Sequence, residues 1–275
     1  MKRRRLFECS VAGFVVLAGC GTISTIPIVY TPEVSRRSAG EHDYEAAVKA
    51  ISAVMVEDLR LPRLDSVLTV YPHVGAYEMG LRMELDDRPN AADRSVSFAV
   101  ASCRRRKVLA DGQRLAALSW TNRVRTLAHE MMHLGEFALA DWGCNTPHYW
   151  LMEGFAEWGA LTIVDRLGLG NFANAIDASR RAIEGGNAEV PLMTAVDSER
   201  GWMAAEQSVG RGAVYSKAVL AVDFLIARKG LAAVADYFAR FKDPAARGDH
   251  FAAAFGEDEQ AFTNAFEAQL KTPPL

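Results

Sequence analysis

Two histidines placed four residues apart inside a long helical run constrain this chain more than any other feature. His129 and His133 belong to the segment HEMMH, which follows the helix-forming run from Arg123 to Ala128. Side chains at positions i and i+4 project from the same face of a helix, so both imidazoles can reach one ion. The apolar residues of the segment fall on another side of the helix: Val124, Leu127, Met131 and Leu134. We therefore expect this helix to pack by one face and to present both histidines to a site on the other.

The next predicted helix supplies a third ligand. Residues 150–157 read WLMEGFAE, and the preceding loop, 143–147, is long enough to turn the chain back along the first helix. Glu153 on this second helix is our candidate, because a catalytic zinc site uses three protein ligands and keeps one position open. His148 is the alternative, although a histidine at the predicted start of a helix is more often structural.

The segments HEMMH and WLMEGFAE resemble those of gluzincin peptidases, above all the aminopeptidase-N-like enzymes and their smaller relatives. The resemblance implies a zincin-like domain with one Zn²⁺ held by His129, His133 and Glu153. It also implies that Glu157 holds the free ring N–H of a ligand histidine, with an exposed helix glutamate as the alternative. The gap from His133 to Glu153 is one residue longer than is usual in these aminopeptidases. Leu139 stands where a metzincin has histidine, which excludes that class.

Glu130 and Tyr215 are the candidate catalytic side chains. Glu130 lies beside the open position, where a carboxylate can take a proton from the attacking water and pass it to the leaving amine. Tyr215 lies in VYSKA, which resembles the aminopeptidase segment YxKG with alanine in place of glycine. In that family the tyrosine stabilises the oxyanion. Tyr215 also shares a helical stripe with apolar residues, so a core tyrosine is an equal alternative.

The segment GAYEMG at 75–80 is similar to the aminopeptidase segment GxMEN, but it departs from that segment at the positions that matter. Tyr77 replaces the methionine, and the asparagine is missing. We interpret this segment as the edge of a strand. The sequence therefore leaves open whether cleavage occurs at chain ends or within chains.

The N-terminus is typical of a bacterial lipoprotein. A basic start, MKRRR, precedes an apolar run that is too short to span a bilayer and that ends in LAGC at Cys20. LAGC resembles a lipobox, which implies that residues 1–19 are removed and that a lipid on Cys20 attaches the protein to a membrane; a plain secretory peptide is the alternative. Residues 20–40 are expected to form a tether. Gly21 lacks the aspartate associated with inner-membrane retention, which implies the periplasmic side of the outer membrane.

Charge and cysteine usage fit an exported protein. Residues 1–19 carry four basic residues and one acidic residue, so their removal changes the formal charge from -3 to -6. The basic run 104–107 is interpreted as a solvated turn, and no nucleic-acid partner is expected. Cys103 and Cys144 remain as an even pair, for which a disulfide and two free thiols are both open. The oligomeric state is left open.

Hydrophobic periodicity predicts an α+β domain over residues 41–275. A helix is expected from Glu41 to about Arg60, and it is followed by β-prone segments at 67–71, 77–85 and 95–100. From residue 112 the pattern is helical, and the part from about 170 onward is mainly helical. The expected blocks are 116–137, 148–168, 172–184, 212–229, 231–242 and 258–270, with Phe251, Phe255, Phe262 and Phe266 as packing residues.

These features predict a zinc metallopeptidase, membrane-tethered in the bacterial envelope, that acts on a peptide or protein substrate. One alternative is a non-catalytic zinc-containing envelope lipoprotein that acts as a binding module. Another is a metal-dependent hydrolase of non-peptide substrates. The presence of Glu130 favours an enzyme, because a structural zinc is usually closed by four protein ligands.

Overall fold

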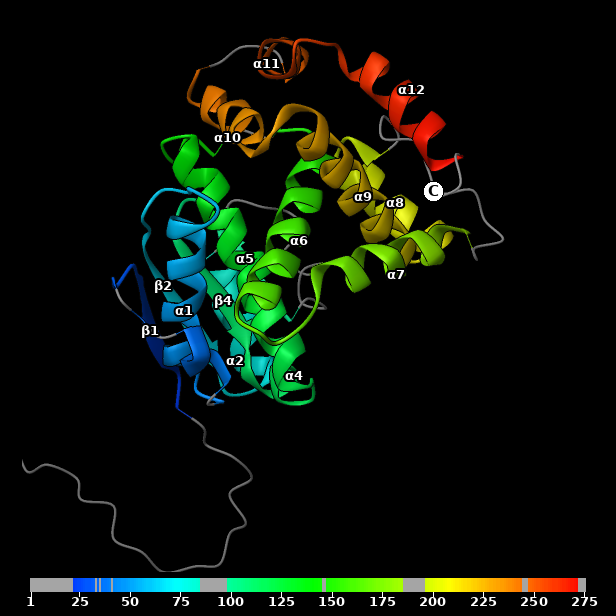
Figure 1. Cartoon of the computed structure of the whole chain (residues 1–275). Helices are drawn as coiled ribbons and strands as arrows, with labels where there is room; N and C mark the ends of the chain where they lie inside the picture. Colours follow the sequence, from blue (N-terminus) through cyan, green and yellow to red (C-terminus); the bar gives the residue numbers. More distant parts are fainter. Residues whose placement is uncertain are drawn as a thin grey trace, which may run out of the picture.

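The chain folds into a small sheet followed by a mainly helical C-terminal part, which confirms the predicted α+β class (Figure 1). The computed structural model describes residues 22–32, 34, 36–40, 42–84, 98–144, 147–184, 196–243 and 247–271. The predicted signal peptide 1–19, the lipid site Cys20 and Gly21 lie outside the described residues.

The described strands form one sheet in the order β1-β2-β4-β3. β2 pairs with β1 in antiparallel and with β4 in parallel orientation, and β3 pairs with β4 in antiparallel orientation. The exposed residues Arg104, Arg105 and Arg106 lie in the turn between β3 and β4. The strands are β1 (Ser24–Val29), β2 (Asp65–Tyr71), β3 (Ala99–Ser102) and β4 (Lys107–Asp111). β2 confirms the strand predicted at 67–71, whereas β4 was not predicted.

The interpretation of residues 20–40 as a tether is wrong for much of that segment. Residues 24–29 form β1, an edge strand of the sheet, and Arg36–Gly40 form a short 3-10 helix, η1. Pro27 suggested an irregular segment, but proline is tolerated in an edge strand, where its missing N–H removes no ladder bond on the solvent side. The side chain of Ile28 in β1 is fully buried in the hydrophobic core, which fixes the strand to the domain.

The strand predicted at 77–85, with a strand edge at 75–80, is also wrong, because Val74–Glu84 form helix α2; residue 85 lies outside the described residues. Its buried residues Tyr77, Gly80 and Leu81 follow the helical spacing i, i+3, i+4. Gly80 has no Cβ, and this leaves room for the Tyr71 ring, which fills that space. The short length of the segment and its three scattered apolar positions made the two periods hard to separate in the sequence.

The remaining helices follow the predicted blocks closely. They are α1 (Tyr44–Glu57), α4 (Gly112–Ala116), α5 (Trp120–Leu139), α6 (Tyr149–Arg166), α7 (Phe172–Glu184), α8 (Glu199–Val209), α9 (Arg211–Lys229), α10 (Leu231–Ala239), the 3-10 helix η3 (Arg240–Lys242), α11 (Arg247–Phe255) and α12 (Glu259–Leu270). The sequence analysis did not resolve α4, α8 and α11 as separate helices. Among the described residues, no helix is long and apolar enough to cross a membrane.

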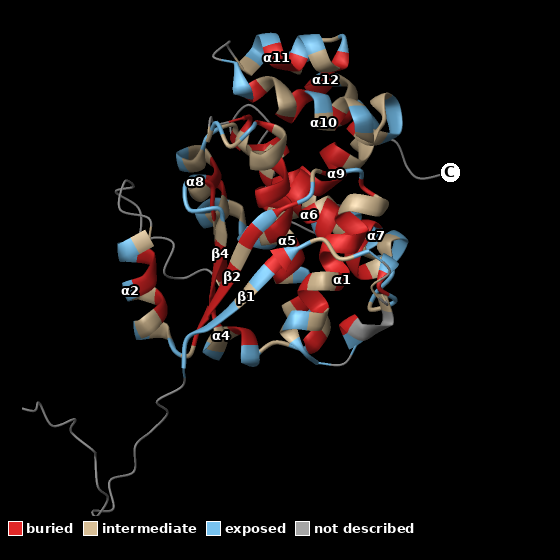
Figure 2. Ribbon diagram, turned by 90° about the vertical axis from the view of Figure 1, so that its left-hand side faces the viewer, coloured by how far each residue is buried: buried red, intermediate tan, exposed pale blue. Residues whose placement is uncertain are grey.

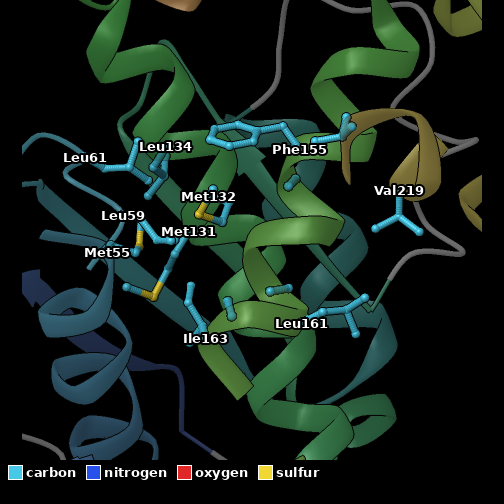
Figure 3. Close-up of a cluster of buried hydrophobic side chains, with 14 of the residues drawn as sticks. Met55, Leu59, Leu61, Met131, Met132, Leu134, Phe155, Leu161, Ile163 and Val219 are labelled. Carbon is cyan, nitrogen blue, oxygen red and sulfur yellow. The ribbon is translucent and has the colours of Figure 1, made fainter. Parts of the chain in front are cut away.

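The sheet carries helices on both faces, and the larger core lies on the face of α1, α5 and α6 (Figure 2). The smaller core, under α2, is built from Tyr71, Tyr77, Leu81, Val100 and Leu109. In the larger core, Met131 and Met132 of α5 pack among leucines and methionines from neighbouring elements (Figure 3). The predicted packing residues Phe251, Phe255, Phe262 and Phe266 are all buried. Helix α5 is therefore fixed over most of its length by apolar contacts.

Candidate metal centre

Helices α5 and α6 bring two imidazoles and one carboxylate together. The Nε2 atoms of His129 and His133 are 3.2 Å apart. Glu153 places Oε2 3.4 Å from Nε2 of His129 and Oε1 3.7 Å from Nε2 of His133. All three side chains are largely buried, at 12%, 8% and 9% exposed. These buried donor atoms form a group that can hold a metal ion.

Two glycines allow α6 to come close enough to its neighbours for this convergence. A Cβ on Gly154 would lie 2.7 Å from the carbonyl oxygen of Ala218, so α6 and α9 touch at the residue that follows Glu153. A Cβ on Gly159 would overlap the side chain of Met132 on α5. The close approach fixes the position of α6 relative to the histidines.

The Nδ1 atom of each histidine, on the side of the ring away from the shared point, is hydrogen-bonded to a buried carboxylate. Nδ1 of His129 lies 3.2 Å from Oε2 of Glu157, and Nδ1 of His133 lies 2.9 Å from Oε2 of Glu136. A carboxylate only accepts, so each Nδ1 carries the proton and each Nε2 faces the shared point. Glu157 also accepts a hydrogen bond from Arg125. This arrangement orients both rings toward one ion.

The charged groups of the centre are strongly coupled. Burial lowers the pKa of His129, but the hydrogen bonds to Glu153 and Glu157 outweigh it and raise the pKa to about 9. Burial raises the pKa of Glu157, whereas its hydrogen bond to His129 and the charge of Arg125 bring it down to about 2. Burial raises the pKa of Glu136 to about 7. The site thus favours positive charge at its centre, which is what a cation would supply.

Glu130 lies beside the histidines and contacts the edge strand. Its Oε2 accepts a hydrogen bond of 2.6 Å from the backbone N–H of Ala101 in β3. Burial raises the pKa of this carboxyl, and the charges of His129 and His133 oppose that rise. The side chain thus lies close enough to the three candidate ligands to interact with their charges, and it also contacts β3.

Tyr215 of α9 belongs to the same site. Its hydroxyl donates a hydrogen bond of 2.9 Å to Oε2 of Glu153, and its ring centroid lies 5.9 Å from that of His129. The sequence left open whether Tyr215 is a catalytic or a core tyrosine. In the structure it is partly buried and lies at the edge of the centre. The Tyr215 hydroxyl is therefore in direct contact with a candidate ligand carboxylate.

His148, the alternative third ligand, does not join this centre. Its Nδ1 is 2.6 Å from the hydroxyl of Tyr237, and its Nε2 is 3.2 Å from Oε2 of Glu259 and 4.0 Å from Oδ1 of Asp197. Glu259 accepts a further hydrogen bond of 2.8 Å from Trp150. We name this set, with Asp197, the His148 cluster; it joins the start of α6 to α10 and α12.

Two functional neighbours were missed in the sequence, namely Glu136 and Arg125. Glu136 could have been found as the acidic residue in the otherwise apolar stretch 134–140, three positions after His133. Arg125 carries no such signal, because its role depends on the packing of α6 against α5. Glu136 contacts the ring of His133, and Arg125 pairs with the carboxylate of Glu157.

Cys103 and Cys144 form a disulfide, with their Cα atoms 5.7 Å apart. The bond links the turn after β3 to the loop after α5. It therefore ties the edge strand that contacts Glu130 to the C-terminal end of the histidine helix.

Comparison with known protein families, with characterised proteins and with solved structures gives no match to this chain.

Proposed function

We propose that this protein is a zinc-dependent peptidase of gluzincin type with a zincin-like domain. The observation that carries the proposal is the convergence of His129, His133 and Glu153, with Glu130 beside it. When bound, zinc would polarise the scissile carbonyl and make a water molecule more acidic. The residues present fit this ion, because imidazole nitrogens and a carboxylate oxygen are its usual ligands at catalytic sites.

The donor spacing favours zinc over a non-haem iron site, which also uses two histidines and a carboxylate. Ligands at zinc bond lengths of about 2.0–2.1 Å lie about 3.3–3.4 Å apart in a tetrahedron and only about 2.8–3.0 Å apart at adjacent octahedral positions. The two imidazole nitrogens are 3.2 Å apart, and Oε2 of Glu153 lies 3.4 Å from His129, while its Oε1 lies 3.7 Å from His133. The first two distances are closer to the tetrahedral than to the octahedral value.

The side chains around the centre have separate roles in this proposal. Glu130 takes the proton of the attacking water and passes it to the leaving amine. Its raised pKa suits both halves of that task. Tyr215 keeps its proton, because burial raises its pKa well above the ordinary value, and it can donate to the carbonyl oxygen as negative charge develops. Glu157 and Glu136 hold the two imidazoles in position.

The edge strand β3 favours a peptide substrate over other hydrolysable groups. The carbonyl of Phe98 accepts a hydrogen bond from the N–H of Asp111 in β4. The N–H of Ala101 points to the opposite side of β3, where it donates to Glu130. Within the described residues, β3 has no strand on that side. An extended peptide can add to such an edge through its backbone, which would carry its carbonyls past Glu130.

The test combines metal analysis with cleavage. We expect about one zinc per purified protein and cleavage of a peptide library, and Glu130→Gln should keep the zinc while losing activity by about 100-fold or more. Zinc with no cleavage by the wild type would favour a binding module. Activity on esters or sugars alone, lost in Glu130→Gln, would favour a hydrolase of other substrates.

We also propose that the protein is held at the envelope membrane by lipid on Cys20. β1 begins at Ser24, so an extended chain of four residues allows a span of only about 14 Å between the lipid and the sheet. The domain would then lie against the membrane. Cys20→Ala should release the protein from washed membranes into the soluble fraction; wild-type protein found in that fraction would contradict the proposal.

A further inference from the structure

A second polar group lies next to the metal centre, at the corner between α8 and α9. Arg211, the first residue of α9, places Nη2 3.4 Å from the hydroxyl of Tyr215. That hydroxyl donates to Glu153, so two hydrogen-bond lengths separate the guanidinium from a ligand carboxylate. A positive charge is thus held at the rim of the centre.

The guanidinium is held at one side and free at the other. It lies over the Tyr215 ring, 5.0 Å from the ring centroid, and its Nε is 3.7 Å from Oε1 of Glu206. The same Oε1 accepts a hydrogen bond of 3.1 Å from Trp202. The Arg211 side chain is 57% exposed, and within the described residues its Nη1 has no hydrogen-bond acceptor.

The other arginine at the centre differs in this respect. Arg125 donates to Glu157, which in turn holds His129, so its charge is already matched inside the site. The pair of Arg211 with Glu206 is longer than a hydrogen bond, and it uses the Nε side of the guanidinium. Nη1 and the second N–H of Nη2, whose other N–H faces Tyr215, remain as a planar fork, which matches a carboxylate with two parallel hydrogen bonds.

We propose that Arg211 binds a carboxylate of the substrate, so that the enzyme prefers peptides with a carboxylate close to the cleaved bond. This inference rests on the peptidase function proposed above and names its substrate class. The carboxylate can be the C-terminal group of the peptide or the side chain of an aspartate or glutamate. A single guanidinium with one free fork suits a group of one negative charge, and the Tyr215 ring and Glu206 hold it in place before the substrate arrives.

The test uses matched peptides that differ only in the carboxylate. One pair has a free or an amidated C-terminus, and a second pair has glutamate or glutamine beside the cleaved bond. We expect kcat/KM to favour one of the carboxylate peptides by about 10- to 100-fold, mostly through KM. Arg211→Gln should remove that preference, and Arg211→Lys should restore part of it. Arg228→Gln, on the far end of the same helix, should keep the wild-type ratio.

The ratio between paired peptides separates recognition from mere positioning of Tyr215. If Arg211→Gln slows cleavage of acid and amide peptides by the same factor, the proposal is overturned. Preference for the free C-terminus would identify an enzyme acting near chain ends, and preference for glutamate an enzyme acting within chains; either supports the proposal.

Equilibrium binding keeps this inference separate from the peptidase function. Fluorescent acid and amide peptides are titrated into zinc-loaded Glu130→Gln protein, with and without Arg211→Gln, and anisotropy is measured. If acid-selective binding needs Arg211 but the wild-type protein cleaves no peptide, the proposed peptidase function is wrong and the carboxylate site is supported. If the wild type cleaves peptides without preferring acids, the peptidase function is supported and the carboxylate site is wrong.

Discussion

The metal centre and the His148 cluster are built from the same residue types, yet their atoms are arranged differently. Each contains histidine and carboxylate groups whose ligand atoms lie within 4.8 Å of one another. In the metal centre, the two imidazole nitrogens lie 3.2 Å apart, and the two oxygens of Glu153 lie 3.4 and 3.7 Å from them. In the His148 cluster, the Tyr237 hydroxyl faces the imidazole Nδ1, and Trp150 and Arg247 supply hydrogen atoms to the carboxylates.

The difference shows how protein donors decide whether such a cluster can accept a cation. Around His148, the backbone N–H donates to Tyr237, the hydroxyl pairs with Nδ1, and Nε2 pairs with Glu259. Arg247 adds a full positive charge 3.1 Å from Asp197. A cation would have to displace these groups, and the cluster is complete without one. In the metal centre, both imidazoles make their carboxylate hydrogen bonds on the outer side of the ring, and the Tyr215 hydroxyl is the neighbour that donates to a ligand atom.

The largest expected effect comes from removing a ligand in one cluster and its counterpart in the other. His133→Ala should lower zinc affinity by more than about 100-fold and abolish peptide cleavage, because the ion loses one of three protein ligands. His148→Gln should leave zinc content and kcat/KM close to wild type. Competition with a chelator of known affinity measures both variants; equal zinc loss in the two would erase the distinction between the clusters.

A smaller effect is expected from the carboxylates that hold the imidazoles. Glu157→Gln keeps the shape of the side chain but weakens the bond to His129, and should cost about 10- to 100-fold in zinc affinity or activity. Glu257→Gln, which contacts Arg228 and Lys229 away from the centre, is the matched control. Unchanged zinc affinity in Glu157→Gln would show that this glutamate does not orient the histidine.

Zinc should also stabilise the fold by binding at the metal centre and not at the His148 cluster. At a free zinc concentration 100 times Kd, the free energy of unfolding should rise by about 2.7 kcal/mol, which is about 5–10 °C in Tm for a domain of this size. Removal of the ion with a chelator should reverse the shift. His133→Ala should show no zinc-dependent change in Tm. A zinc-dependent rise in that variant would place the ion elsewhere, for instance in the His148 cluster.

The smallest effect is expected in the His148 cluster, and it should be one of stability. Burial raises the pKa of Glu259, but its hydrogen bond and charge interaction with His148, and the hydrogen bond from Trp150, bring the pKa below its ordinary value. Glu259→Gln should therefore cost about 1–3 kcal/mol of unfolding free energy at neutral pH, without loss of zinc.

The sign of the pH dependence follows from the lowered pKa of Glu259. The stabilising contribution of its carboxylate is fully present above the pKa of the unfolded chain and is lost as pH falls through the folded value. The gap in stability between wild type and Glu259→Gln should shrink on acidification. Denaturant titrations at neutral and acidic pH measure it; a gap that widens as pH falls would contradict the assigned ion pair.

Secondary structure could be predicted where apolar periodicity extends over several turns. The helices that became α1, α5, α6, α7, α9 and α12 are long, and their periods stand out. β1 and α2 could not be read in this way. Pro27 is acceptable only because β1 is an edge strand, and α2 is held by the fit of Gly80 against Tyr71. Both facts belong to the sheet and not to the local sequence.

What the sequence by itself determined is the pairing of His129 and His133, because four residues of helix always bring two side chains to one face. It also favoured Glu153 as the third ligand, with His148 at the start of the same predicted helix as the alternative. Only the tertiary structure placed Glu153 next to the histidines and His148 in a separate cluster. The close contacts at Gly154 and Gly159 set the position of α6, and with it which of its side chains meets the histidines. Glu136, Arg125 and Arg211 acquire their roles in the same way, since charge pairing across helices depends on packing that no local pattern encodes.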